Sequence, residues 1–184
     1  VNALSKQLKV EVKRDGKIHT QEYSKGKPLY GMKSEGTSDT TGTKVTFLPD
    51  DEIFTESIYH YDTLSARLRE LAFLNKGLKI SLEDERDGKK NEFCYTEGIV
   101  SFVEYLNKNK NPINGVIYFK KEKDDLEVEI AVQYNDGYQE NVFSFANNIN
   151  TIDGGTHLSG FKTALTRTMN QYAEKHNMKD LKLT

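Results

Sequence analysis

The sequence predicts an α+β protein composed of two small units. Several short segments alternate apolar and polar residues, as strands with one covered face do, and Gly-containing turns separate them in pairs. Longer segments repeat apolar residues at spacings of three and four, which is the pattern of amphipathic helices. With 184 residues, of which 36% are hydrophobic and 29% charged, the chain is long enough to bury a core of ordinary globular composition.

The opening segment is predicted to form an antiparallel hairpin. Residues 8–12 alternate apolar and polar side chains, Asp15 and Gly16 suit a tight reversal, and residues 18–23 return as the partner strand. The next stretch, residues 26–42, is rich in Gly, Ser, Thr and Lys, so we expect a long surface loop there.

A short strand, a helix and a second hairpin are predicted to follow. The strand carries Val45, and Asp62 is placed to cap a helix of regularly spaced leucines. The hairpin pairs residues 78–82 with residues 93–95 across an Arg-Asp-Gly turn.

The second unit is predicted to begin at residue 97 with a helix, and no flexible linker precedes it. Three strands follow that helix, at residues 115–120, 126–134 and 141–148. Gly154 and Gly155 then permit a sharp reversal into a last helix, which Thr156 is placed to cap. Residues 179–184 are expected to start another element.

Composition argues against several classes of function. No apolar run approaches the ~18 residues of a membrane span, so we expect a cytoplasmic protein with no membrane partner. The single Cys94 cannot form an internal disulfide, and no His or Cys spacing indicates a metal site. The net charge of −2 argues against broad nonspecific binding of nucleic acid but leaves a local basic face open. Neither a phosphate-binding Gly-Lys loop nor a Gly-x-Ser-x-Gly elbow is present, so no catalytic residue is predicted.

Six blocks of sequence occur in an order that characterises one protein family. The blocks are VNALS at 1–5, RDGKI at 14–18, TGTKVTFLPD at 41–50, RLRELAFLN at 67–75, EGIVSFVEYLN at 97–107, and residues 133–167. Together they resemble the B subunits of bacterial type II topoisomerases, and DNA gyrase more closely than topoisomerase IV. Six blocks in one order are far more specific than any one of them.

The resemblance implies a fold for each part of the chain. Residues 1–96 would be the C-terminal part of a GHKL-type (Bergerat) ATPase domain. Residues 97–184 would be the N-terminal part of a transducer domain that resembles domain 2 of ribosomal protein S5. Because Val1 is not a Met and falls within a family motif, we interpret the chain as an internal fragment. The family's magnesium-binding Asn, water-activating Glu and adenine-binding Asp would precede it, and its catalytic Lys would follow it.

The resemblance also implies a function for the intact protein. That protein would use ATP and Mg²⁺ to drive DNA strand passage and supercoiling, together with the A subunit of gyrase and double-stranded DNA. It would dimerise through an N-terminal arm absent here, and aminocoumarin inhibitors would bind its ATP site. We expect the fragment itself to bind no cofactor and to be catalytically inactive. The alternatives are a fragment of the B subunit of topoisomerase IV or a non-catalytic α+β interaction module.

Four residues match functional positions of the family, and a fifth is a further candidate. Thr43 matches the residue that helps to hold adenine, Val45 an apolar residue of the pocket, and Arg14 the arginine that aminocoumarins contact. The residues alone favour ordinary structural roles, with Thr43 as a turn residue, Val45 as a core residue and Arg14 as a hairpin charge. The resemblance favours the functional role for Thr43. Lys162 matches a basic residue that faces the DNA cavity, with Arg167 as the next candidate. The alternative for Lys162 is an ordinary solvated charge on a helix.

Overall fold

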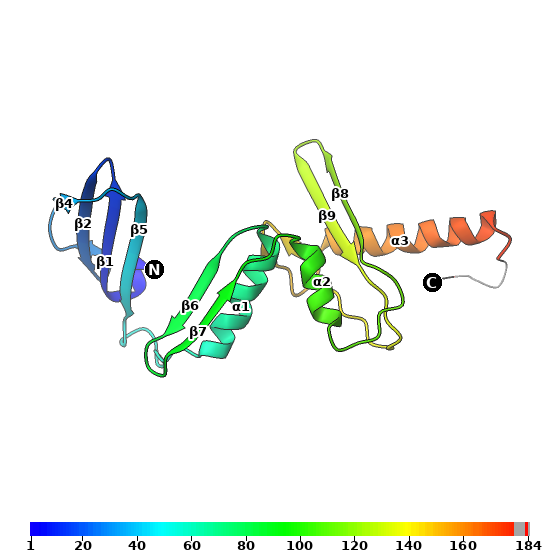
Figure 1. Cartoon of the computed structure of the whole chain (residues 1–184), viewed down its shortest axis with the longest axis horizontal. Helices are drawn as coiled ribbons and strands as arrows, with labels where there is room; N and C mark the ends of the chain where they lie inside the picture. Colours follow the sequence, from blue (N-terminus) through cyan, green and yellow to red (C-terminus); the bar gives the residue numbers. More distant parts are fainter. Residues whose placement is uncertain (179–182, 184) are drawn as a thin grey trace. The chain divides into compact units, whose positions relative to one another are not determined.

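The computed structural model of the chain describes residues 1–178 and 183. These residues group into two units, Val1–His60 and Tyr61–Thr184 (Figure 1). The first unit is a sheet, and the second alternates helices with hairpins, so the predicted α+β class is confirmed. The predicted domain boundary between residues 96 and 97 lies within the second unit and stays a prediction about the domains of a longer protein.

The first unit is an antiparallel sheet in the order β3 (Lys27–Pro28), β2, β1, β5, with β4 (Lys33–Thr37) also paired to β2. A short 3₁₀ helix at Asn2–Leu4 precedes its three long strands, β1 (Ser5–Arg14), β2 (Lys17–Ser24) and β5 (Gly42–Pro49). The predicted β1–β2 hairpin is confirmed, and its turn residues Asp15 and Gly16 have φ of 53° and 74°. Positive φ at both positions is the geometry that matches the twist of a two-residue hairpin.

The prediction of a loop at residues 26–42 is wrong in part. This segment contains β3 (Lys27–Pro28) and β4 (Lys33–Thr37), and both pair with β2. All five residues of β4 are exposed, so their side chains carry no apolar alternation. The strand forms because the free edge of β2 offers backbone donors and acceptors, a signal that hydropathy does not record.

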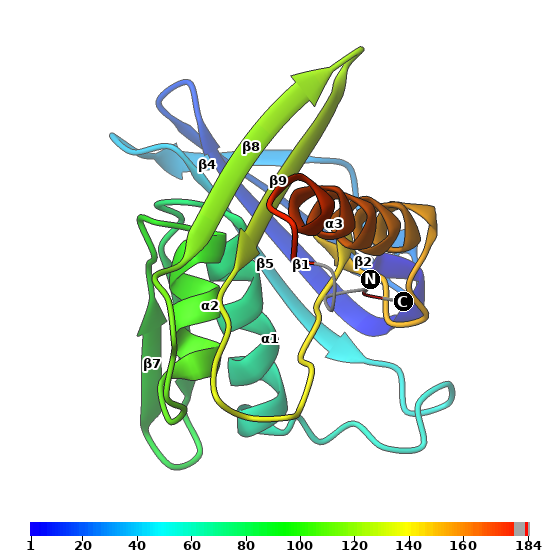
Figure 2. The same ribbon diagram turned by 90° about the vertical axis from the view of Figure 1, so that its right-hand side faces the viewer.

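The second unit contains three helices and three two-stranded pairs among its described residues. Its elements are α1 (Tyr61–Leu74), β6 (Ile80–Asp84), β7 (Lys89–Phe93), α2 (Ile99–Asn107), β8 (Ile117–Lys123), β9 (Leu126–Val132), β10 (Phe145–Ala146), β11 (Ile149–Asn150) and α3 (Thr156–Lys175). The predicted β6–β7 hairpin and the predicted helix α2 are confirmed. Figure 2 shows β8 and β9 as a long hairpin that projects beyond α2.

Aromatic rings form the core of the second unit. Phe73 of α1 is 1% exposed, and its ring centroid lies 3.7 Å from that of Tyr95 and 5.1 Å from that of Phe102 in α2. Phe102 in turn contacts Phe143 and Phe145. Residues on both sides of position 96 therefore share one apolar core.

Three local predictions are wrong. Only Phe145–Ala146 of the predicted strand 141–148 is a strand, because Asn147 and Asn148 have φ of 49° and 65° and turn the chain back into β11. Thr156 is the first residue of α3, where Gly155 occupies the cap position with no side-chain hydrogen bond. Asp62 lies in the first turn of α1 rather than before it.

The structure supplies two further observations about the predictions. The element expected at residues 179–184 lies outside the described residues, apart from Leu183. Among the described residues, none of the helices combines the length and the apolar character needed to cross a bilayer.

Phe73→Ala is predicted to lower the free energy of unfolding of the second unit by about 3–5 kcal/mol, because it opens a cavity between α1 and α2. Urea denaturation followed by circular dichroism measures the loss. Phe119→Ala is the matched control, since Phe119 is 47% exposed on β8 and its removal leaves no cavity. Equal losses for the two variants would contradict this description of the core.

Candidate functional site

The strand register of the first unit brings the predicted ATP-site residues onto one face of the sheet. β1 and β5 pair so that Val10 lies opposite Val45 and Val12 lies opposite Thr43. Side chains directly opposite each other in an antiparallel pair share a face, and successive residues alternate between faces. Arg14 is two residues beyond Val12, so it belongs to the same face.

This face, which we call the Thr43 face, is open to solvent. Thr43 is exposed, and Val45 is 52% exposed, so Val45 is not a core residue of this unit. The side chain of Arg14 is 77% exposed, and its Nε lies 3.7 Å from Oδ2 of Asp15. The face thus presents an apolar strip with a hydroxyl beside it and a cation near the hairpin turn.

Two further residues of the Thr43 face were missed from the sequence. The β1–β2 register places His19 opposite Val12 and Gln21 opposite Val10. Both are half-buried. The signal was available, because a two-residue turn at Asp15 and Gly16 fixes which residues of the two strands are opposite each other.

A hollow of about 310 Å³ lies at the end of β5. Its walls are mainly apolar, and they include Leu4, Phe47, Pro49, Phe54 and Ile58. Thr43 and Val45 lie further along β5, on the open part of the sheet. The candidate site is therefore a wall rather than an enclosed pocket within this unit.

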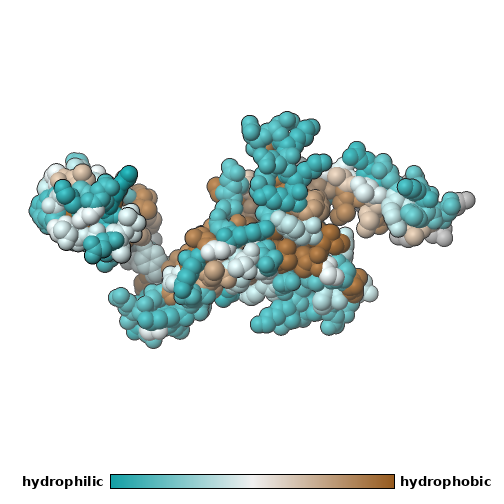
Figure 3. All heavy atoms as spheres, turned by 45° about the horizontal axis from the view of Figure 1, so that its top comes forward, coloured by the Kyte–Doolittle hydropathy of each residue, from teal (hydrophilic) through white to brown (hydrophobic). Residues whose placement is uncertain are grey.

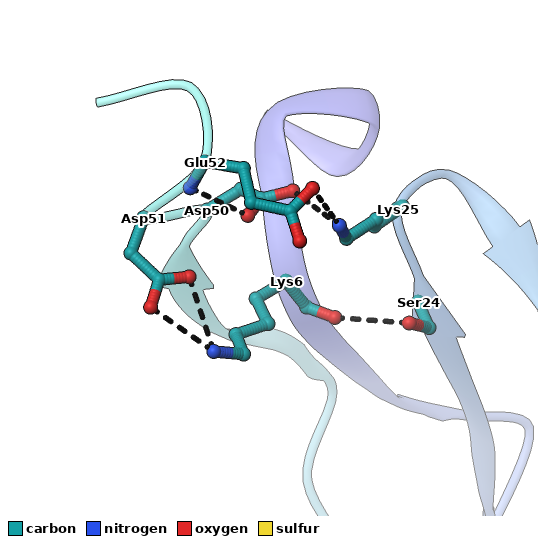
Figure 4. Close-up of polar contacts among 6 residues, drawn as sticks. All are labelled: Lys6, Ser24, Lys25, Asp50, Asp51 and Glu52. Carbon is teal, nitrogen blue, oxygen red and sulfur yellow. Dashed lines mark hydrogen bonds and ion pairs between the residues drawn. The ribbon is translucent and has the colours of Figure 1, made fainter. Parts of the chain in front are cut away.

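A cluster of charged side chains fixes the end of β5 (Figure 4). Asp50 is 2% exposed, and its carboxylate accepts a hydrogen bond from the backbone N–H of Glu52 at 3.1 Å. Nζ of Lys25 lies 3.4 Å from the Asp50 carboxylate and donates to Oε2 of Glu52 at 2.6 Å. We call Lys25, Asp50 and Glu52 the Asp50 clasp.

The clasp joins all three long strands at one end of the sheet. The backbone N–H of Lys25 donates to the carbonyl of Ser5 at 3.0 Å, and that of Asp50 donates to Leu4 at 3.1 Å. Hydrogen bonding to Glu52, together with the nearby Asp50 carboxylate, raises the pKa of Lys25, so this cation keeps its charge at neutral pH. The clasp therefore resists separation of β5 from β1 and helps to hold the register on which the Thr43 face depends.

The predicted DNA-contact residues lie on α3 in the second unit. Nζ of Lys162 donates to Oε1 of Glu140 at 2.7 Å, and the two side chains are 51% and 67% exposed. Arg167 lies on the same helix and is exposed. A phosphate that bound Lys162 would compete with the Glu140 carboxylate, a partner that the sequence did not indicate.

The described residues show no group of three or more His, Cys, Asp or Glu side chains that could hold a metal ion. The cations and the hydroxyl of the two candidate surfaces are suited to binding anions and polar ligands, not to coordinating metals.

Sequence comparisons relate the chain to one family. A family profile with the description DNA gyrase B matches residues 98–184. The B subunit of DNA gyrase from Halalkalibacterium halodurans is 56% identical over 181 residues, which is 97% of this chain and 28% of that protein. The B subunit of DNA gyrase from Clostridium acetobutylicum is 58% identical over 177 residues, again with 28% of that protein covered. The chain thus spans less than a third of the length of these relatives.

Solved structures of two proteins resemble the chain. The 43K ATPase domain of Thermus thermophilus gyrase B, in complex with an aminocoumarin, has a TM-score of 0.84 and 37% identity over 96% of this chain and 49% of that one. The B subunit of the DNA gyrase from Myxococcus xanthus has a TM-score of 0.85 over 93% of this chain and 51% of that one. Its 24% identity supports the fold alone. These matches confirm the resemblance that the six sequence blocks indicated.

Lys25→Met is predicted to destabilise the first unit more than Lys6→Met. Lys25 faces the buried Asp50 carboxylate, whereas Lys6 faces Asp51, whose side chain is 67% exposed. Amide hydrogen exchange at residues 52–54 is the measurement, since these N–H groups bond to Asp50. Faster exchange in Lys6→Met than in Lys25→Met would rule out the clasp.

Proposed function

Because the chain belongs to the DNA gyrase B family, we propose that it supplies part of the ATP-hydrolysing subunit of a bacterial type II DNA topoisomerase. The observation that carries the proposal is the strand register, which gathers Thr43, Val45 and Arg14 on one open face. ATP binding and hydrolysis by the whole protein would drive DNA strand passage and supercoiling. The chain covers 28% of its two curated relatives, so these activities are proposed for a longer protein.

The Thr43 face suits one wall of a nucleotide site. The Thr43 hydroxyl both donates and accepts hydrogen bonds, so it matches the edge of adenine directly or through a water molecule. Val45 and the strip beside it offer apolar contact to the base. Arg14 would lie at the mouth of the site and contact an aminocoumarin, the class of ligand bound to the Thermus thermophilus relative.

The remaining parts of the reaction would come from other residues of the longer protein. Phosphoryl transfer needs a base that orients water, a metal ion and a cation at the terminal phosphate, all positioned together. The Mg²⁺ ligands would lie elsewhere, given that the described residues contain no group suited to a metal. We therefore expect a polypeptide of these 184 residues alone to hydrolyse no ATP.

The second unit would take part in coupling nucleotide binding to DNA. We propose a domain boundary near residues 96 and 97, in agreement with a family profile match that begins at residue 98. Residues 97–184 would then belong to the transducer domain, with Lys162 and Arg167 as candidate contacts to double-stranded DNA. The partners that follow from this function are the gyrase A protein and another copy of the longer protein, and the location is the cytoplasm.

Thr43→Val is predicted to weaken binding of a non-hydrolysable ATP analogue to the intact protein about 5-fold, the equivalent of one hydrogen bond worth about 1 kcal/mol. Isothermal calorimetry measures the affinity. Thr46→Val is the matched control, because Thr46 pairs with Lys9 on the opposite face of β5. The proposal fails if the two variants change the affinity equally.

Lys162→Ala is predicted to weaken binding of duplex DNA to the intact protein and to reduce the slope of log K against log salt by about 1, the contribution of one phosphate contact. Glu140→Gln should strengthen binding, because it removes the carboxylate that competes for Lys162. Fluorescence anisotropy at several salt concentrations measures both effects.

Glu127→Gln is the control for this experiment. It frees Lys120 on the β8–β9 hairpin from an equivalent ion pair of 2.7 Å without changing α3. If Glu127→Gln and Glu140→Gln strengthen DNA binding equally, the effect comes from net charge and not from Lys162.

A further inference from the structure

Lys76 connects the end of α1 to the β8–β9 hairpin. Its Nζ lies 3.0 Å from Oε1 of Glu129 in β9 and donates to the hydroxyl of Tyr118 in β8 at 3.2 Å. The Tyr118 hydroxyl donates to the same Glu129 oxygen at 2.7 Å. The Lys76 ammonium also lies 4.8 Å from the centroid of the Tyr118 ring, within the range of a cation–π contact. The three side chains thus form a closed network between two elements that are distant in sequence.

This network is partly shielded from water. The side chain of Glu129 is 26% exposed and that of Lys76 is 46% exposed. Burial acts to raise the pKa of Glu129, but hydrogen bonds from Tyr118 and Lys76 outweigh it, and the net pKa is lowered. The pKa of Lys76 is raised by its hydrogen bonds to Glu129 and Tyr118. Both groups therefore stay charged at neutral pH, where their contact is strongest.

Gly98 provides the space through which Lys76 reaches the hairpin. This glycine caps the start of α2 with a φ of 62°, a backbone conformation that side chains disfavour. A Cβ added at Gly98 would lie 2.5 Å from Cε and 2.7 Å from Cγ of Lys76. The methylene groups of Lys76 therefore pack directly against Gly98 at the N-terminus of α2, where any side chain would clash with them.

The other contacts of α1 in this region reach different elements. Phe73 stacks on Phe102 of α2, and Arg69 donates to the hydroxyl of Tyr105 in α2 at 2.8 Å. α2 also packs against β9, and the side-chain amide of Asn107 at the end of α2 donates to Oε1 of Gln133, just after β9, at 2.8 Å. The projecting end of the hairpin is hydrophilic at its surface (Figure 3). The contacts that set the direction of the hairpin therefore lie near its base, where Lys76 contacts Tyr118 and Glu129.

We propose that Lys76, Tyr118 and Glu129 form a latch that fixes the direction of the β8–β9 hairpin relative to α1, with Gly98 as the seat of the latch. The latch is polar and half exposed, whereas the Phe73–Phe102 contact beneath it is apolar and buried. Opening the latch therefore frees the hairpin to change direction while the core stays closed. The inference concerns how residues before and after position 96 move together, and it does not depend on the proposed function.

Distance measurement between two spin labels tests the latch in the intact protein. One label is placed on α1 through Ala66→Cys and the other on β8 through Glu122→Cys, in a protein whose own cysteines, Cys94 included, are replaced by Ser. A closed latch gives a single narrow distance distribution, and Lys76→Ala should replace it with a broad one. High salt should broaden the distribution of the unaltered latch, because the ion pair is half exposed, but should leave that of Lys76→Ala unchanged. An identical distribution with and without the Lys76 side chain would overturn the proposal.

Two glycine variants test the role of Gly98 as the seat of the latch. Gly98→Ala and Gly88→Ala place the same side chain at positive φ, but a Cβ at Gly88 would meet nothing within 4 Å. Only Gly98→Ala should broaden the distribution of distances between the two labels. When combined with Lys76→Ala, it should cause no further broadening. Further broadening in that background would show that Gly98 acts through α2 and would remove it from the proposal. Glu129→Gln opens the latch without touching the backbone, so it serves as the test if Gly98→Ala does not fold.

Discussion

The first unit depends on the backbone pairing of β1 with both of its neighbours. β1 bonds β2 on one edge and β5 on the other, and each ladder fixes which side chains share a face. A slip of one residue in the β1–β5 ladder would move Thr43 and Val45 to the face now occupied by Lys44 and Thr46. The register of the strands thus decides which side chains lie on the Thr43 face, and the chemistry proposed for that face depends on it.

Different interactions maintain each unit. In the first, the Asp50 clasp binds the ends of β1, β2 and β5 through a buried carboxylate and backbone hydrogen bonds. In the second, the ring of Phe73 is the centre of an aromatic core to which α1, α2 and the segment after β9 all contribute. The polar groups specify how strands and helices end, and the apolar rings supply most of the stabilisation.

Structure that is encoded by neighbouring residues could be predicted from the sequence, whereas pairing between distant residues could not. Asp15 and Gly16 predicted the first hairpin correctly, because the two-residue turn is encoded by the residues within it. β4 was missed because it pairs through its backbone and buries nothing. The reversal at Asn147 and Asn148 was missed although a signal was present, because two adjacent Asn residues tolerate the positive φ that the turn requires.

In the candidate sites, too, individual residues could be selected from the sequence, but their partners from distant parts of the chain could not. Thr43, Val45 and Arg14 were selected by family resemblance, and the register then showed that they share one face. Neither the Glu140 partner of Lys162 nor the Glu129 partner of Lys76 could be predicted, because each ion pair joins elements that are brought together only by folding.

The central claim is that one face of β5 forms a wall of a nucleotide site, and cysteine scanning along β5 tests it most directly. Single cysteines at positions 43–46, in an intact protein whose own cysteines, Cys94 included, are replaced by Ser, are alkylated with and without a non-hydrolysable ATP analogue. The account predicts protection at 43 and 45 and none at 44 and 46. Equal protection at all four positions, or protection at 44 and 46 alone, would contradict it.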